Sequence, residues 1–482
     1  MAKKPEARPS VVDPGLRAFR VALLVVLVAL ALTTEERTFG TVADEQQVLY
    51  TGVSMAELGE IGVARGALFT VRRPQGDAVS PYGIGLSIVN ALPALVAAPF
   101  ERTFGAGASN TLFVLESILL VALAAAGAGL LARDLGAAPE GVALAVVGTA
   151  LGSPLWAYAG ANYSEPLQAA ALALAVLFSG RAATAAEPRS WRFGAAAGCL
   201  AGVAVLAKGT NVVLFPFAAL PLLFDGVDPW NAAGRRKRLL AFAAGAASSL
   251  GVWLAFEVVR FGRPLASYGG TGFTHPFLDG FWRLLIGPNK GIVFYFPLVV
   301  LALLGLSRLA HRGEVRGTFL ALAGIPAAFL LLASAWFAWD GVVGWGPRLL
   351  VPGMPLLAAA AGASASTRAT RFAGRVLVAA GVLVNALGVF QNEAATSAYL
   401  AAAPPLVVSE KEAARFPAMF VTKEGQGRPA LSLTYKAAEN AALSPFRVHL
   451  FLLGARLSGD PARLASPPWG AAHPEFVPTG AG

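Results

Sequence analysis

Residues 19–62, FRVALLVVLVALALTTEERTFGTVADEQQVLYTGVSMAELGEIG, join an apolar run, Phe19–Leu32, to an acidic stretch, Ala43–Gly62. We interpret the apolar run as a first membrane helix that is not cleaved, because no small-residue cleavage site follows it. Asp44 and Glu45 then stand side by side where the chain should just have left the membrane. Ionisable groups at a membrane edge are functional candidates by default. The alternative is a solvated loop with ordinary charges.

The composition indicates an all-α polytopic membrane protein. Of 482 residues, 56% are hydrophobic and only 14% are charged, whereas soluble domains carry roughly 25% charged residues. The formal net charge of +10 is explained by basic loops that hold the membrane topology, so nucleic acid is not an expected partner. Cys199 is the only cysteine, which excludes an intrachain disulfide.

The apolar runs predict about 11 transmembrane helices. They lie at about residues 19–32, 110–132, 140–158, 165–180, 193–207, 211–225, 239–259, 291–307, 317–337, 349–364 and 375–391. The five inner loops then hold 14 Lys and Arg residues, against 6 in the four short outer loops. This asymmetry places the N-terminus inside and the C-terminus outside. It also predicts that Pro81–Phe100 lies along the outer interface or dips into the membrane without crossing it.

Three parts of the chain follow from this topology. Residues 1–392 form the transmembrane domain, and residues 33–109 within it form a long first outer loop with interfacial helices. Residues 393–482 form a small extracytoplasmic appendage, which is rich in proline and partly irregular. Weak β signals around Phe420 and Leu431 do not decide its fold.

Three cations stand in Gly- or Pro-rich connections on the predicted outer side. Lys208 in AKGTN, residues 207–211, joins two helices of about 15 residues, which span roughly 22 Å of a hydrocarbon core of roughly 30 Å. Lys208 therefore either faces a cavity or snorkels to headgroups. Arg348 in WFAWDGVVGWGPRLLVP, residues 336–352, either grips a phosphate or anchors an aromatic belt. Lys290 stands in GPNKGIVFYFP, residues 287–297.

Other catalytic signatures are missing from the sequence. The four histidines are scattered, and there is no zinc motif, P-loop, dinucleotide fingerprint or nucleophilic serine elbow. Glu165 opens a predicted helix from the outer side, where a helix-capping role and a functional one are both open.

Several of these stretches together resemble the C-type glycosyltransferase superfamily (GT-C), particularly its bacterial protein mannosyltransferase-like and aminoarabinose transferase-like members. ADEQQVLYTGVSMAELGEIG is similar to the acidic first-loop motif, and SPYGIGLSIVNALP to the interfacial segment after it. Tyr82 and Gly83 stand where many members have paired prolines. AGVAVLAKGTNVVLFP, GPNKGIVFYFPL and GWGPRLLVPGMPLL resemble further segments. The resemblance covers about residues 16–392.

The resemblance implies a transferase of the bacterial cytoplasmic (inner) membrane that takes sugar from a polyprenyl-phosphate carrier. The acceptor would be a lipid, glycan or protein on the outer side. Asp44 would be the catalytic carboxylate, with Glu45 beside it. Some relatives use a divalent metal near that acid, and Glu45 and Glu165 are candidate ligands here. Substrate-binding candidates are Lys208, Arg348, Lys290, Tyr82 and Glu165.

Direct displacement by the acceptor would invert the anomeric carbon, with Asp44 as general base. A lipid or solute transporter, a carrier-lipid ligase and a non-enzymatic assembly protein stay open as alternatives. A transporter would place its charged groups near the membrane midplane.

Overall fold

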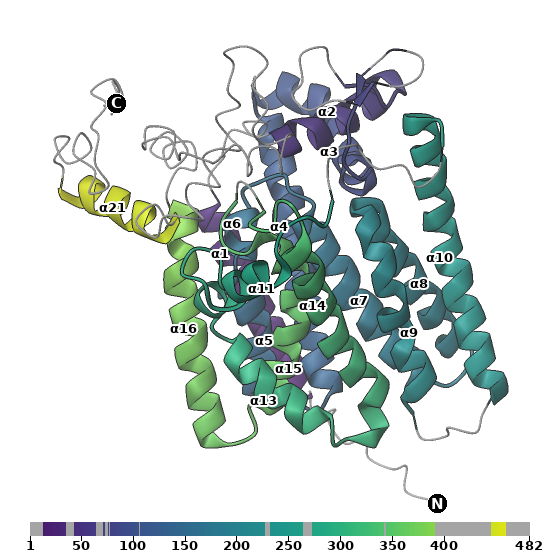
Figure 1. Cartoon of the computed structure of the whole chain (residues 1–482), viewed down its shortest axis with the longest axis vertical. Helices are drawn as coiled ribbons and strands as arrows, with labels where there is room; N and C mark the ends of the chain where they lie inside the picture. The colour runs from purple at the N-terminus through teal and green to yellow at the C-terminus, as the bar shows by residue number, and fades with distance from the viewer. Residues whose placement is uncertain are drawn as a thin grey trace, which may run out of the picture.

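The fold is an array of helices that run back and forth along one axis (Figure 1). This is seen in a computed structural model, which describes residues 13–34, 43–63, 71–72, 76, 78–105, 107–226, 232–263, 272–341, 344–390 and 445–458. All structural statements below concern these residues. Neighbouring helices are joined by short connections, as the spacing of apolar runs predicts.

Among the described residues, seven helices are long and apolar enough to cross a membrane, and four apolar segments are shorter. The long ones are α1 (Pro14–Thr33), α4 (Ser109–Asp134), α7 (Glu165–Thr184), α8 (Arg189–Ala207), α10 (Ala232–Phe261), α14 (Arg316–Ala335) and α16 (Arg368–Phe390). The shorter ones are α5 (Pro139–Ala150), η1 with α9 (Gly209–Leu214, Phe215–Phe224), α13 (Val299–Leu309) and η3 with α15 (Arg348–Gly353, Met354–Ser364). Together they coincide with the eleven predicted helices and confirm the polytopic membrane fold.

Four of the predicted helices are not continuous. After α5 the chain turns before the short α6 (Leu155–Tyr158), and α13 is separated from α12 (Ile292–Tyr295) by Pro297. η1 and η3 begin their segments as tighter 3₁₀ turns. Proline lacks the N–H that continues an α-helix, which accounts for the breaks at Pro154 and Pro297. Irregular backbone at membrane depth occurs where protein or a cavity surrounds it, so these breaks point to a site.

α2 (Ala43–Leu58) and α3 (Gly85–Phe104) lie together at one end of the array, at the top of Figure 1. The short antiparallel strands β1 (Val71–Arg72) and β2 (Ala78–Val79) belong to the chain between them. The two helices approach closely, because a Cβ at Gly52 would lie 2.7 Å from that of Asn90. α3 is not among the helices with membrane-crossing character. This agrees with the predicted interfacial segment, and we call this end of the array the α2–α3 end.

The opposite end gathers the arginine-rich connections. Arg133 at the end of α4 pairs with Asp13 at the start of α1 at 2.8 Å, and Arg181 pairs with Asp134 at 2.7 Å. The Arg133 guanidinium also holds the pKa of Asp13 below its usual value. Lys237 pairs with Glu187, Arg312 donates to the carbonyl oxygen of Leu135, and Arg375 pairs with Glu140. These contacts place the five predicted inner loops at one end of the array.

Small residues bring the helices together. Gly198 and Gly245 lie where α8 and α10 touch, and a Cβ at either would overlap a facing backbone carbonyl. Gly305 of α13 faces Ala360 of α15 in the same way. These alanine- and glycine-rich runs are thus close-packing surfaces.

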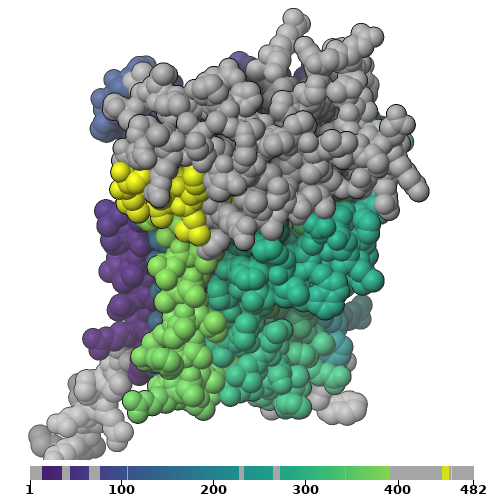
Figure 2. Space-filling view, turned by 60° about the vertical axis from the view of Figure 1, so that its left-hand side comes forward, coloured from purple at the N-terminus to yellow at the C-terminus, as the bar shows by residue number. Residues whose placement is uncertain are grey.

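The tail contains one described helix, α21 (Pro445–Ser458), which lies across the upper end of α16 (Figure 2). His449 Nδ1 lies 2.9 Å from the carbonyl oxygen of Leu387, and its ring is 4.7 Å from that of Trp345. Phe420 and Leu431 lie outside the described residues. The division of the chain at residue 392 stays a prediction.

The topology can be tested by cysteine labelling in a Cys199→Ser background. Exposed Arg236, at the start of α10, and exposed Glu57, near the end of α2, stand at opposite ends of the array. We expect Glu57→Cys to react with an impermeant maleimide in intact cells and Arg236→Cys to react only after permeabilisation. Labelling of both positions from the same side would contradict the eleven-helix topology.

Candidate active site

The site is built around Arg348, the first residue of η3. A glycine-rich turn, Gly344–Pro347, directly precedes Arg348. The arginine is buried, with only 9% of its surface exposed. Gly344 has φ of +135°, and a Cβ there would lie 2.8 Å from the Tyr158 hydroxyl and 3.2 Å from Cδ of Arg348. The glycine therefore lets the turn wrap closely around the arginine side chain.

The guanidinium of Arg348 joins two carboxylates from distant parts of the chain. Its Nη2 lies 2.8 Å from Oδ2 of Asp44 on α2, and its Nε donates to Oε1 of Glu165 on α7 at 2.8 Å. Its carbon Cζ lies 4.0 Å from the centre of the Tyr163 ring. A planar guanidinium suits two carboxylates at once, because its N–H groups form a fixed fork.

Asp44 stands in the first turn of α2, where the helix dipole favours a negative charge. Its second oxygen, Oδ1, accepts a hydrogen bond from the Tyr82 hydroxyl. Glu45 points elsewhere, and its Oε1 accepts a hydrogen bond from the backbone N–H of Asn162 at 3.0 Å. Adjacent acids in a helix diverge in this way. Asp44 is therefore the acid that faces the arginine.

Lys208 follows α8 and is half-buried beside the same cluster. It lies close enough to Glu165, Arg348 and Asp44 to interact with each electrostatically. Burial lowers the pKa of its ammonium group, and the two carboxylates act in the opposite direction. The cavity-facing and the snorkelling alternatives for Lys208 both stay predictions.

Lys290 contacts the turn that precedes Arg348. It is 4% exposed, and its Nζ donates to the carbonyl oxygen of Gly344 at 2.9 Å. Gly344 belongs to the turn that precedes Arg348, so this hydrogen bond helps to hold that turn in place. A direct contact of Lys290 with substrate stays a prediction.

Sequence reasoning missed a second polar group beside the site. In the orientation that satisfies both of its amide atoms, Asn90 of α3 donates to both carboxylate oxygens of Glu116 at 3.1 Å and accepts from the Asn162 amide at 3.0 Å. Glu116 is the only acid within the apolar body of α4. A lone acid in a membrane helix is a signal that could have identified it.

The arrangement of acids does not fit a divalent metal. The described residues contain no group of three or more His, Cys, Asp or Glu side chains that could hold a metal ion. Asp44 and Glu165 both direct carboxylate oxygens at a guanidinium, which occupies the place a cation would take. We therefore derive no step through a metal, and metal use stays an untested expectation.

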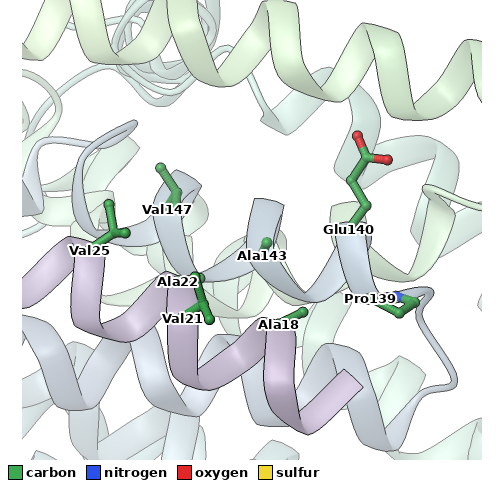
Figure 3. Close-up of a pocket in the computed structure, with 8 residues that line it drawn as sticks. All are labelled: Ala18, Val21, Ala22, Val25, Pro139, Glu140, Ala143 and Val147. Atoms are coloured by element: carbon green, nitrogen blue, oxygen red, sulfur yellow. The ribbon is translucent and has the colours of Figure 1, made fainter. Parts of the chain in front are cut away.

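A groove with a volume of about 340 Å³ lies away from this cluster, between α1 and α5 (Figure 3). Its lining residues are Ala18, Val21, Ala22, Val25, Pro139, Glu140, Ala143 and Val147. Glu140, the one ionisable group among them, pairs with Arg375 at 2.5 Å. This apolar groove lacks the paired acids and cations of the Arg348 cluster, so we place the candidate active site at the cluster.

No family model and no curated protein sequence match the chain. The crystal structure of ArnT from Cupriavidus metallidurans bound to undecaprenyl phosphate is similar, with a TM-score of 0.50 and 16% identity over 93% of this chain and 78% of that one. The archaeal oligosaccharyltransferase AglB from Archaeoglobus fulgidus, in complex with an inhibitory peptide and a dolichol-phosphate, gives a TM-score of 0.45 and 13% identity over 80% of this chain and 57% of that one. ArnT is an aminoarabinose transferase of the GT-C superfamily. The chain therefore has the GT-C fold, as the sequence motifs predict.

Loss of Arg348 should destabilise the protein, because it leaves the Asp44 and Glu165 carboxylates without their counter-charge. We expect Arg348→Met to lower the free energy of unfolding by about 3–5 kcal/mol, measured by thermal and denaturant unfolding in detergent. Adding Asp44→Asn and Glu165→Gln should recover part of the loss, since neutral amides need no cation.

Exposed Arg263 provides the matched control, and Arg263→Met should unfold like the wild type. If Arg348→Met were as stable as Arg263→Met, the ion pairs of Arg348 would contribute nothing to the fold.

Proposed function

We propose that the protein is a membrane glycosyltransferase that moves a sugar from a polyprenyl-phosphate carrier to an acceptor at the α2–α3 end. The distribution of Lys and Arg favours the extracytoplasmic side for this end. The GT-C fold shared with ArnT supports the class of reaction. The lipid in that ArnT structure, undecaprenyl phosphate, supports a carrier of the same chemistry here.

The observation that carries the proposal is the buried guanidinium of Arg348 between Asp44 and Glu165. Two acids and two cations, Arg348 and Lys208, meet at one end of a membrane protein. A phosphate can take the place of a carboxylate on a guanidinium, because both present two oxygens to its fork. The cluster is thus suited to exchange an internal anion for the phosphate of a lipid carrier.

Donor binding would prepare the base. In the described state Oδ2 of Asp44 is held by Arg348 at 2.8 Å, so this oxygen is not free to receive a proton from the acceptor. When the carrier phosphate draws the guanidinium toward itself, Oδ2 is released. Tyr82 keeps hold of Oδ1 and so fixes the direction in which the freed oxygen points. Asp44 would therefore become active only after the donor has bound.

The transfer itself is a single displacement. The acceptor hydroxyl oxygen forms a bond to the anomeric carbon, and its proton passes to Oδ2 of Asp44. The bond between the anomeric carbon and the phosphate oxygen breaks, and polyprenyl phosphate leaves with the electron pair. Arg348 and Lys208 stabilise the charge that develops on this leaving group. Attack opposite the leaving group inverts the anomeric carbon. The acceptor can be a lipid, a glycan or a protein.

A transporter fits this arrangement less well. Broken helices of transporters place their ion and substrate sites near the membrane midplane. Here the acids and cations gather at one end of the helices, beside α2 and α3.

The role of Asp44 can be tested with a labelled polyprenyl-phosphate sugar. We expect Asp44→Asn to lower the transfer rate by roughly 10²–10⁴-fold, because the amide keeps the shape but cannot accept the proton. Binding of the carrier should persist or tighten, since the amide no longer competes for Arg348. The same assay without acceptor separates transfer from hydrolysis of the carrier.

Glu57→Gln, an exposed change on the same helix, is the control and should transfer sugar like the wild type. Transfer by folded Asp44→Asn at the wild-type rate would rule out this residue as the base.

The cations can be tested by carrier binding. We expect Arg348→Ala and Lys208→Ala each to weaken binding of polyprenyl phosphate about 10- to 100-fold, because a charged hydrogen bond contributes about 1.5–3 kcal/mol. Arg348→Lys should not restore full affinity, since an ammonium lacks the planar fork. Unchanged affinity in all three folded variants would contradict the phosphate site.

A further inference from the structure

Arg260 forms an ion pair that the site described so far does not explain. It lies near the end of α10 and is 4% exposed, as is Glu257 one turn earlier, with which it pairs. The rings of Phe256 and Phe261 lie 4.7 and 4.3 Å from its guanidinium carbon. A buried ion pair generally adds little to stability. Its presence on a helix at the edge of the array therefore calls for a specific role.

The guanidinium of Arg260 is directed at the backbone just before α3. Its Nη1 donates to the carbonyl oxygens of Ser80 at 3.1 Å and Tyr82 at 2.7 Å. Tyr82 is the residue whose hydroxyl donates to Oδ1 of Asp44. A continuous series of contacts thus runs from Glu257 through Arg260 and Tyr82 to Asp44.

Close packing also fixes the turn at residues 80–85, which Arg260 contacts. A Cβ at Gly83 would overlap the carbonyl oxygens at the end of α8, and one at Gly85 would lie 2.5 Å from the backbone nitrogen of Ala207. Ile84 between them is buried with Trp253 and Phe256 of α10. The turn therefore fits one position, directly beside Lys208.

We infer that Arg260 is a positioning residue for the proposed transfer, which acts by fixing the Tyr82 backbone so that the Tyr82 hydroxyl orients Asp44. The inference rests on the proposed function, in which Asp44 is the general base. Arg260 touches neither the carrier phosphate nor the acceptor in this account. Its loss should therefore affect turnover and leave donor binding unchanged.

A double-mutant cycle on the full-length protein tests the inference. We expect Arg260→Lys and Tyr82→Phe each to lower kcat by about 10- to 100-fold, since a misplacement near 1 Å costs this much. KM for the donor should stay within about twofold. The double variant should be no slower than the slower single variant, because both changes break the same series of contacts from Arg260 through Tyr82 to Asp44. Multiplied defects, or a defect confined to KM, would overturn the inference.

Two further variants distinguish a positioning effect from general misfolding. Arg263→Lys makes the same substitution at an exposed position three residues on and should behave as the wild type. Glu257→Gln keeps the shape of the partner and removes its charge, and it should lower kcat in the same direction as Arg260→Lys. A wild-type kcat in Glu257→Gln together with a normal kcat in Arg260→Lys would also overturn the inference.

Hydrogen exchange separates this inference from the proposed function. Arg260→Lys should raise amide exchange in residues 80–85 and in the first turn of α2, whereas Arg263→Lys should not. This result is expected even if the wild type transfers no sugar from any polyprenyl-phosphate donor, an outcome that would refute the proposed function alone. Equal exchange in the two variants would refute the positioning role.

Discussion

The structure of the site depends on one buried guanidinium. Asp44 and Glu165 lie 121 residues apart in the sequence. Glu165 is buried and Asp44 is half-buried, so each would lose much of its hydration without a counter-charge. Arg348, which arrives from a third element, makes their burial tolerable and fixes the distance between them. In the proposed function, a carrier phosphate and a reacting hydroxyl would require the same charges that these ion pairs use. Stability and chemistry would then compete for one side chain.

The broken helices explain how these side chains can meet at one end of the array. Arg348 opens a 3₁₀ turn, and Lys208 precedes another. A regular helix would carry both side chains along a lipid-facing or packed surface at fixed spacing. Glycine and proline interrupt the helices on the side of α2 and α3. There, neighbouring protein can satisfy the freed backbone groups.

Hydropathy and charge asymmetry were sufficient to predict the eleven helices, because membrane burial requires long apolar runs whatever their tertiary packing. They could not predict the breaks at Pro154 and Pro297 inside those runs. Asp44 and Arg348 stood out as charges in unusual local sequence, but their pairing depends on how distant helices pack. Lys290 stood out equally, and its hydrogen bond to the carbonyl oxygen of Gly344 was not predictable from the local sequence. Nothing in the local sequence singles out Arg260, because a guanidinium that binds backbone carbonyls has no different sequence context from one that binds lipid.

The central claim is that Arg348 passes from Asp44 to the carrier phosphate when the donor binds. An experimental structure of the wild-type protein with bound polyprenyl phosphate tests this most directly. The account predicts the Arg348 guanidinium within hydrogen-bonding distance of the phosphate oxygens, with Oδ2 of Asp44 released and its Oδ1 still bound to the Tyr82 hydroxyl. A phosphate bound elsewhere, with the pair between Arg348 and Asp44 intact, would contradict it.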